Sequence, residues 1–418
     1  MAGWIFNSAL GRAGAMGSIS ASRARWTAPR AAMAVALLAM AGLWAGGPAL
    51  ALDAIVEKKS FTLPAYTTAG GVPLKDVKVG WESYGTLNAD KSNAILVTHF
   101  FSGTSHAAGK YKADDKVPGY WDAIIGPGKP LDTDKYYIIS SDTLVNLNAK
   151  DPNVITTGPA SLQPGTDKPY GMSFPVVGIR DFVNVQKALL DSLGIKKLHA
   201  VMGASMGALQ AYEWAAAYPE MVSRVVPVIG AGDADGWLVE WLDLWAAPIR
   251  LDPNWNNGDY YGRTPPDKGL ALSLKIVTMQ AGYWTWADDA FGRKWAEPGQ
   301  DPAKAMGNRY AIEAALDNVG AARAQVADAN HLLYLVKANQ TFVAGGDGGL
   351  ARIKAPVLLI STGEDLVFPP PAIQRTADGI RAGGAKVEQV TIGGGRGHLN
   401  GVVNISEASG AITRFLAQ

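Results

Sequence analysis

The chain has 418 residues, of which 48% are hydrophobic and 18% charged, so it can bury a sizeable core, which argues against global disorder. Its formal net charge of +1 gives no electrostatic support for a nucleic-acid partner. The sequence contains no cysteine, which excludes disulfides, thiol chemistry and a lipid-modified cysteine. A chain of this length holds one large α/β domain or two ordinary domains.

The first residues have the composition of an export signal. Arginines precede an apolar run over residues 31–44, and the motif Ala-Leu-Ala at 49–51 matches a signal-peptidase site. We therefore predict a signal peptide over residues 1–51, a mature chain that starts near Leu52, and a periplasmic or secreted protein. The alternative is an N-terminal membrane anchor, which the short apolar run and the Gly-Pro pair after it disfavour.

Strand-like and helix-like segments alternate after this leader. Short, nearly continuous apolar runs are typical of parallel strands that are covered on both faces. Such runs predict strands at 77–84, 94–98, 136–140, 198–202, 225–229, 356–361 and 387–392. Helical patterns predict helices at 179–193, 206–218, 370–383 and 401–417. The alternation predicts an α/β fold with a doubly wound, mostly parallel sheet.

One long stretch interrupts the alternation. Residues 231–345 contain helical segments with many aromatic residues but no convincing strand. We interpret this stretch as a helical cap over the mouth of an active site, with a separate helical domain as the alternative. The strand expected after the insertion favours a single structural unit. The predicted parts are therefore a core over 52–230, a cap over 231–345 and a second part of the core over 346–418.

A G-x-S-x-G motif, Gly-Ala-Ser-Met-Gly at 203–207, lies between a predicted strand and a predicted helix. In this setting the motif is typical of a nucleophile elbow, a tight turn that exposes a serine hydroxyl at the top of a sheet. We therefore predict that Ser205 is a catalytic nucleophile. A purely structural glycine turn is the alternative.

A serine nucleophile needs a base, and the base needs an acid that orients it. In the chain order associated with this elbow, the acid follows the serine and the histidine comes last. Of the five histidines, only His398 follows the last predicted strand, where it lies in a glycine-rich loop. Asp365 and Glu364 both follow the strand at 356–361. We prefer Asp365 because the segment that starts the next helix follows it directly.

The oxyanion of an acyl-transfer reaction needs two backbone N–H groups, one of which usually belongs to the residue after the nucleophile. That residue is Met206. The second N–H group should come from the loop after the strand at 94–98, where Phe101 is our choice and Phe100 the next candidate. In the alternative interpretation these aromatic residues only line the pocket.

Several segments resemble the homoserine O-acetyltransferase family of α/β-hydrolases. Besides the elbow they are HFFSGTSH at 99–106, WDAIIGPG at 121–128, LDTDKY at 131–136, FPVVGIRD at 174–181, DPNWNNGDYY at 252–261, ADAN at 327–330, DLVFPP at 365–370 and GH at 397–398. The resemblance covers nearly all of the chain after the leader. It implies an α/β-hydrolase fold with a helical cap, a triad of Ser205, Asp365 and His398, and often a dimer formed through the cap.

Two departures from the family pattern concern the substrate. Members that acylate amino acids carry an arginine shortly before DPNW, where it resembles a clamp for the homoserine carboxylate, and Ala246 stands at that position here. Those members also follow the catalytic histidine with aspartate, and Leu399 stands here instead. Alanine cannot make a charge-assisted bidentate contact, so the departures imply a less polar acyl acceptor or water, unless Arg250 or Arg396 binds a carboxylate. The predicted substrate contacts are Phe100, Tyr260, Tyr261 and Leu399.

Together these observations predict an exported serine hydrolase that cleaves small or medium carboxylic esters through an acyl-enzyme. Acetyl-CoA is not expected outside the inner membrane, which favours water as the acceptor. The alternatives are an acyltransferase such as homoserine O-acetyltransferase, an amidase or lactonase with the same triad, and a non-catalytic binding protein. The sequence shows no metal cluster or nucleotide-binding loop, so we expect no cofactor. The expected partner is a small ester, without nucleic acid or stable membrane association.

Overall fold

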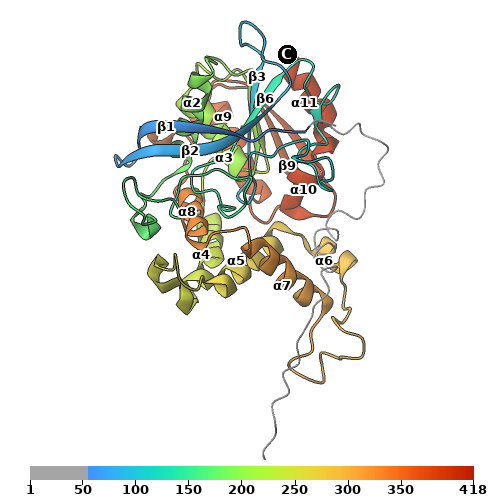
Figure 1. Ribbon diagram of the computed structural model, residues 1–418. Coiled ribbons are helices and arrows are strands. Elements are labelled where there is room, and N and C mark those ends of the chain that lie inside the picture. Colours follow the sequence, from blue (N-terminus) through green and yellow to red (C-terminus); the bar gives the residue numbers. More distant parts are fainter. Residues whose placement is uncertain (1–54) are drawn as a thin grey trace, which may run out of the picture. The chain divides into compact units, whose positions relative to one another are not determined.

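The computed structural model describes residues 55–418, which lie in one compact unit (Figure 1). The predicted signal peptide falls outside the described residues. The centre of the unit is an eight-stranded sheet in the order β1-β2-β6-β3-β7-β8-β9-β10. Its strands are β1 Lys59–Thr67, β2 Pro73–Tyr84, β3 Ala94–Thr98, β6 Tyr137–Ser141, β7 Ala200–Ala204, β8 Val225–Val228, β9 Val357–Thr362 and β10 Val387–Ile392. A separate pair consists of β4 Ile125–Gly126 and β5 Leu131–Asp132.

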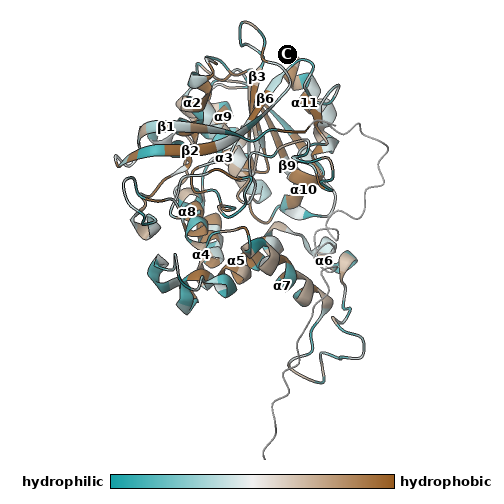
Figure 2. Cartoon of the chain, in the orientation of Figure 1, coloured by the Kyte–Doolittle hydropathy of each residue, from teal (hydrophilic) through white to brown (hydrophobic). Residues whose placement is uncertain are grey.

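The strands from β6 to β10 in the sheet order run parallel to their neighbours, whereas β1 pairs antiparallel with β2, and β2 with β6. The predicted mostly parallel sheet is therefore confirmed. Successive side chains of a strand point to opposite faces. Accordingly Leu96 belongs to one hydrophobic cluster, while its neighbours Ile95 and Val97 belong to a second cluster on the other face. Figure 2 shows the hydrophobic residues concentrated in these central strands.

Helices cover both faces of the sheet. The helices α2 Ile179–Ser192, α3 Met206–Ala217 and α9 Pro370–Ala382 contribute to the cluster that contains Leu96. Helix α11 Ser409–Leu416 contributes to the other cluster through Ile412 and Phe415. A sheet whose strands are covered on both faces needs continuous apolar runs, which explains why the sequence located the central strands so closely.

A helical insertion over residues 231–345 lies between strands β8 and β9 in the chain. Its elements are α4 Gly236–Leu251, η3 Pro253–Gly258, α5 Asp267–Ala281, α6 Trp284–Ala290, α7 Ala311–Ala324 and α8 Ala329–Gln340, and η4 Gly346–Arg352 follows. None of these residues joins the sheet. Helix α5 packs between α4 and α7 at one end of the sheet (Figure 1). The domain boundaries and the role of the insertion as a cap stay predictions.

No helix within residues 55–418 has both the length and the apolar character needed to cross a membrane.

The structure differs from the sequence prediction at the two ends of the core. Strand β1 was not predicted, because it lies at the edge of the sheet and none of its residues is buried. The helix predicted at 401–417 is broken into α10 Asn400–Val403, η6 Ile405–Ala408 and α11. Asn404 at the break donates its side-chain amide to the Gly393 carbonyl at 3.0 Å. A side chain that bonds away from the helix in this way competes with helix continuation.

Candidate active site

Ser205 lies in a sharp turn between β7 and α3. Its backbone has φ 56° and ψ −121°, in the positive-φ region that residues other than glycine seldom adopt. A Cβ atom on Gly203 would collide with the Thr98 hydroxyl, and one on Gly207 with the Thr98 carbonyl. The two glycines of the motif thus let β7 and α3 approach β3 closely, and the strained turn presents the serine, as expected for a nucleophile elbow.

The structure brings the three predicted triad residues together. The Nε2 atom of His398 lies 2.8 Å from the Ser205 hydroxyl, and its Nδ1 atom lies 2.8 Å from Oδ2 of Asp365. Asp365 follows β9, and His398 belongs to η5 Gly397–Leu399, which follows β10. All three side chains are buried. A carboxylate that accepts from the Nδ1–H group leaves Nε2 free to accept the serine proton.

Asp365 and Glu364 have different partners. Oδ1 of Asp365 accepts from the backbone N–H groups of Val367 and Phe368 at 2.8 and 2.9 Å, so the carboxylate is held rigidly beside the imidazole. Glu364 instead accepts from the side chain of Asn400 at 2.8 Å and, at longer distance, from two glycine amides of the histidine loop. The structure therefore places Asp365, and not Glu364, against the histidine.

The end of helix α5 lies directly on the histidine loop. Gly397 has φ +63°, and a Cβ atom there would lie 2.6 Å from the Gly282 carbonyl and 3.1 Å from Cβ of Tyr283. Only glycine combines this backbone conformation with so close an approach. The helical insertion is thus in contact with the residue that precedes His398.

The two predicted oxyanion donors form no hydrogen bond with another group in the described part of the chain. The N–H groups of Phe101 and Met206 donate to no acceptor within residues 55–418. Met206 is the first residue of α3, where the helix dipole adds positive potential. The Phe101 ring is buried edge-on against Trp245 of α4, with ring centroids 5.2 Å apart. Their role as an oxyanion hole stays a prediction that this placement suits.

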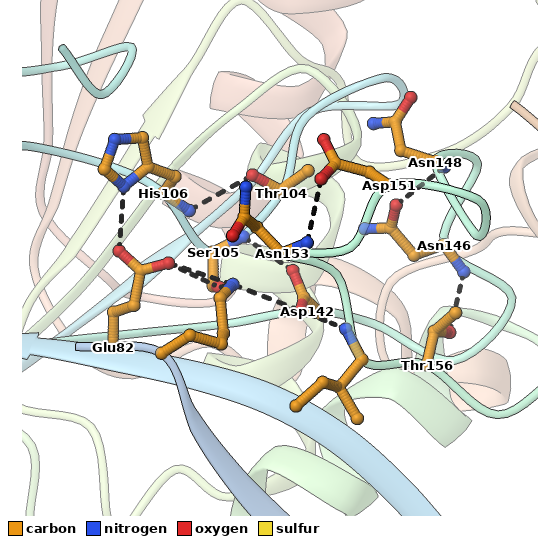
Figure 3. A network of polar contacts seen from close by, with 12 residues as sticks. Glu82, Thr104, Ser105, His106, Asp142, Asn146, Asn148, Asp151, Asn153 and Thr156 are labelled. Carbon is orange, nitrogen blue, oxygen red and sulfur yellow. Dashed lines mark hydrogen bonds and ion pairs between the residues drawn. The ribbon is translucent and has the colours of Figure 1, made fainter. Parts of the chain in front are cut away.

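Residues 99–106, which we call the oxyanion loop, are held by polar side chains that include the buried Asn146 and the half-buried Asn148, both labelled in Figure 3. Asn146 donates to the Gly103 carbonyl and Asn148 to the Ser102 carbonyl, both at 3.1 Å. His99 bonds to the Phe100 carbonyl through Nδ1 and accepts from the Thr143 N–H through Nε2. Burial lowers the pKa of His99 to about 4, so this histidine is a neutral structural group.

Two of the predicted substrate contacts, Tyr260 and Tyr261, form hydrogen bonds to a buried carboxylate. The hydroxyls of Tyr260 and Tyr261 donate to the two carboxylate oxygens of Asp328 at 2.9 and 3.0 Å, and Tyr260 is only 3% exposed. Burial and the charge of Asp328 raise the pKa of both hydroxyls, which therefore remain donors. Asp328 also caps α8 by accepting from the His331 N–H. Both tyrosines thus join the segment after η3 to the start of α8, and their contact with a substrate stays a prediction.

The other two predicted contacts lie beside the site. Leu399 directly follows His398 in η5 and is half-buried. Phe100 is also half-buried, and its ring packs edge-on against Tyr120 with centroids 5.2 Å apart. Neither side chain carries a charge, so neither can bind the ammonium or carboxylate of an amino acid.

Replacing Asp328 with alanine is expected to destabilise the protein by about 2–4 kcal/mol, because two tyrosine hydroxyls and a helix N-terminus lose their acceptor. Urea unfolding of the purified variant measures this loss. The matched control is Asp259→Ala, which removes a carboxylate from an exposed pair with Arg263 and should change the free energy of unfolding by less than about 1 kcal/mol. Equal stability of both variants would contradict a structural role for Asp328.

Arg250 and Arg396, the two arginines that could bind a substrate carboxylate in place of the family's arginine, have different surroundings. Arg250 pairs with Asp243 at 2.6 Å on the exposed side of α4, while Ala246 of the same helix is buried. Arg396 is half-buried and lies two residues before His398. Within residues 55–418 no group of three or more histidine or acidic side chains could hold a metal ion.

Comparisons with known proteins agree with the fold. Residues 157–396 match the family described as alpha/beta hydrolase fold. Homoserine O-acetyltransferase of Methanosphaerula palustris is 39% identical over 358 residues, which are 83% of this chain and 70% of that protein. The enzyme of the same name from Deferribacter desulfuricans is 38% identical over 82% of this chain and 91% of its own length.

Solved structures give two kinds of neighbour. The crystal structure of esterase E22 is 52% identical with a TM-score of 0.83 and covers 86% of this chain and all of its own. Homoserine O-acetyltransferase from Bacillus anthracis is 35% identical, also with a TM-score of 0.83, and covers 87% of this chain and 98% of its own. The chain is therefore an enzyme of the α/β-hydrolase superfamily and belongs to the homoserine O-acetyltransferase family.

Proposed function

We propose that this protein is a serine hydrolase that cleaves small or medium carboxylic esters. The observation that carries the proposal is the hydrogen-bonded chain from Ser205 through His398 to Asp365, with both contacts at 2.8 Å. A serine hydroxyl is a poor nucleophile at neutral pH unless a base lies within hydrogen-bond reach, and this arrangement supplies the base and its partner.

In the proposed first half-reaction, the Ser205 oxygen attacks the ester carbonyl while Nε2 of His398 takes the hydroxyl proton. Asp365 stabilises the resulting imidazolium. The carbonyl oxygen becomes an oxyanion, which accepts hydrogen bonds from the N–H groups of Phe101 and Met206. The tetrahedral intermediate then expels the alcohol, which receives its proton from His398, and the acyl group remains on Ser205.

In the second half-reaction, water attacks the acyl-enzyme with His398 as the base. The acid leaves, and the proton returns to Ser205. Water rather than an amino acid is proposed as the acceptor because Ala246 and Leu399 are apolar at the two positions where amino-acid-acylating members of the family carry charged residues, and Arg250 pairs with Asp243. The similarity to esterase E22 supports this choice.

The second candidate is acyl transfer, which the similarity to homoserine O-acetyltransferases favours. Arg396, near the histidine, is the side chain that would then have to receive the carboxylate. The same triad also serves amidases and lactonases, since the leaving group is selected by the surrounding pocket.

A substrate panel separates these candidates. Ester hydrolysis is expected to exceed acetyl transfer to homoserine, because one missing contact to a charged group, about 1.5–3 kcal/mol, weakens acceptor binding about 10- to 150-fold. The panel compares kcat/KM for chromogenic esters with two to eight acyl carbons, the matching anilides, and acetyl-CoA with homoserine. Ser205→Ala protein is the blank in every arm. Transfer to homoserine faster than ester hydrolysis would reverse the assignment.

We also propose that the enzyme is exported and works outside the inner membrane as a periplasmic or secreted protein. We further propose that it forms a homodimer through the insertion. The composition of residues 1–51 supports export, and the family resemblance supports the dimer. N-terminal sequencing of the protein from a periplasmic extract tests the first proposal, since cleavage should expose Leu52. Recovery of the protein only from the cytoplasmic fraction, with its first residues intact, would contradict it.

A further inference from the structure

Two buried carboxylates lie beneath the oxyanion loop and share one lysine. Glu82 belongs to β2 and Asp142 directly follows β6, and both side chains are 0% exposed. Nζ of Lys58, whose side chain is 11% exposed, lies 2.9 Å from Oε1 of Glu82 and 3.4 Å from Oδ2 of Asp142. Lys58 thus lies within ion-pair distance of both carboxylates.

The loop is attached to this cluster through Ser105 (Figure 3). The Ser105 N–H donates to Oδ1 of Asp142 at 2.8 Å, and its hydroxyl donates to Glu82 at 3.1 Å and also contacts Nζ of Lys58. His106 bonds to the second oxygen of Glu82 at 3.0 Å. Phe101, the proposed oxyanion donor, lies only four residues before Ser105.

Lys58 reaches the cluster from the segment that precedes β1. This segment is held beside the end of the loop region, since the Val56 N–H donates to the Lys110 carbonyl at 2.8 Å. The lysine therefore comes from the N-terminal side of the described chain, 47 residues before the serine that it contacts. Its side chain joins that segment to the loop.

The charges in the cluster depend on Lys58. Burial alone would raise the pKa of Glu82, but the His106 hydrogen bond and the charge of Lys58 hold it at about 2. Burial raises the pKa of Asp142, an effect that Lys58 opposes. An unpaired buried carboxylate is strongly disfavoured, so without the lysine the cluster must take up protons, admit water or move apart. Each of these changes alters the bonds that hold Ser105.

We propose that Lys58 is a positioning residue for the oxyanion hole: it balances the charge of Glu82 and Asp142, which fix Ser105 and thereby hold the Phe101 N–H in place. This proposal rests on the proposed function, because it assumes that the loop stabilises an oxyanion. The lysine acts through the loop and does not touch the substrate. A donor misplaced by about 1 Å weakens the transition state much more than the bound ester.

The test uses four variants of the full chain. Lys58→Met removes the charge, and Lys58→Arg keeps it. Lys58→Met combined with Glu82→Gln removes one charge of each sign. Lys59→Met is the matched control: Lys59 is the next residue, donates to Ser83 at 3.1 Å and lies over the Trp81 ring, away from the cluster.

Three measurements are made on each variant: kcat and KM for a short-chain ester, inhibition by a trifluoromethyl ketone, which forms an oxyanion on the serine, and the midpoint of thermal unfolding. For Lys58→Met we expect kcat to fall about 10- to 100-fold with KM within about twofold, and inhibition to weaken in parallel with kcat/KM. The kcat of Lys58→Arg and that of the double variant should each be at least fivefold higher than the kcat of Lys58→Met. Lys59→Met should match the wild type.

The double variant decides the question if Lys58→Met alone fails to fold. A folded double variant with kcat near that of Lys59→Met supports charge balance, and one whose kcat stays depressed overturns it. The proposal is also overturned if Lys58→Met raises KM without lowering kcat, or loses ester turnover without losing inhibitor affinity. Failure of the proposed function is distinct, since the wild type would then not turn over the ester.

Discussion

Replacing Ser205 with alanine is expected to lower kcat for a short-chain chromogenic ester by about 10⁴-fold or more, because the acyl-enzyme can no longer form. His398 and the two N–H donors would remain, so substrate binding should persist and KM should change little. Steady-state kinetics of the purified variant measure both parameters. The control is Ser406→Ala, which changes an exposed serine of η6 and should retain wild-type turnover.

Covalent labelling provides a second measurement of the same prediction. A fluorophosphonate should add to the wild type at Ser205, and peptide mass spectrometry should locate it there. The label should be missing from Ser205→Ala protein and form far more slowly in His398→Ala protein, where the base is lost. Full ester turnover by Ser205→Ala protein, or labelling at another serine, would refute the proposed nucleophile.

Replacing Asp365 with asparagine is expected to lower kcat by about 10⁴-fold. The amide is nearly isosteric, but it offers Nδ1 of His398 a donor as readily as an acceptor, which favours the wrong tautomer and leaves the imidazolium without a counter-charge. The acyl-enzyme would then form and break down slowly, whereas the fold should survive.

Glu364→Gln is the matched control for Asp365, because it changes the adjacent carboxylate in the same way. Glu364 supports the histidine loop through Asn400 and glycine amides, and a glutamine oxygen can still accept some of those bonds. We expect kcat within about tenfold of the wild type, as for loss of one hydrogen bond. A larger loss of kcat in Glu364→Gln than in Asp365→Asn would show that Glu364, and not Asp365, is the acid that orients His398.

The central strands and the triad could be predicted from sequence because their signals are local. Strand β3 is a run of five apolar or β-branched residues, and it begins and ends where the sequence predicted. Ser205 lies in a short motif, and His398 follows from the order in which the triad residues occur along the chain. The strand and the motif needed only neighbouring residues, and the acid and the histidine needed in addition the chain order associated with this elbow.

The remaining features depend on pairs far apart in the chain. Tyr260 and Asp328 are 68 residues apart, and their hydrogen bond has no local sequence signal. Lys58 and Asp142 are 84 residues apart, and a lysine before an edge strand ordinarily faces solvent. Sequence periodicity describes which face of an element is buried. It does not identify the distant partner that a buried polar group finds.

The contact between Gly397 and the end of α5 has a consequence for how this family diversifies. The nucleophile and its acid directly follow strands of the sheet, whereas the residue before the base is in contact with the end of α5. Sequence change in the insertion can therefore shift the imidazole by fractions of an ångström without touching the core. Substitutions in the insertion can thus change which acyl acceptor is used while the triad stays the same. This requires that position 397 remains glycine.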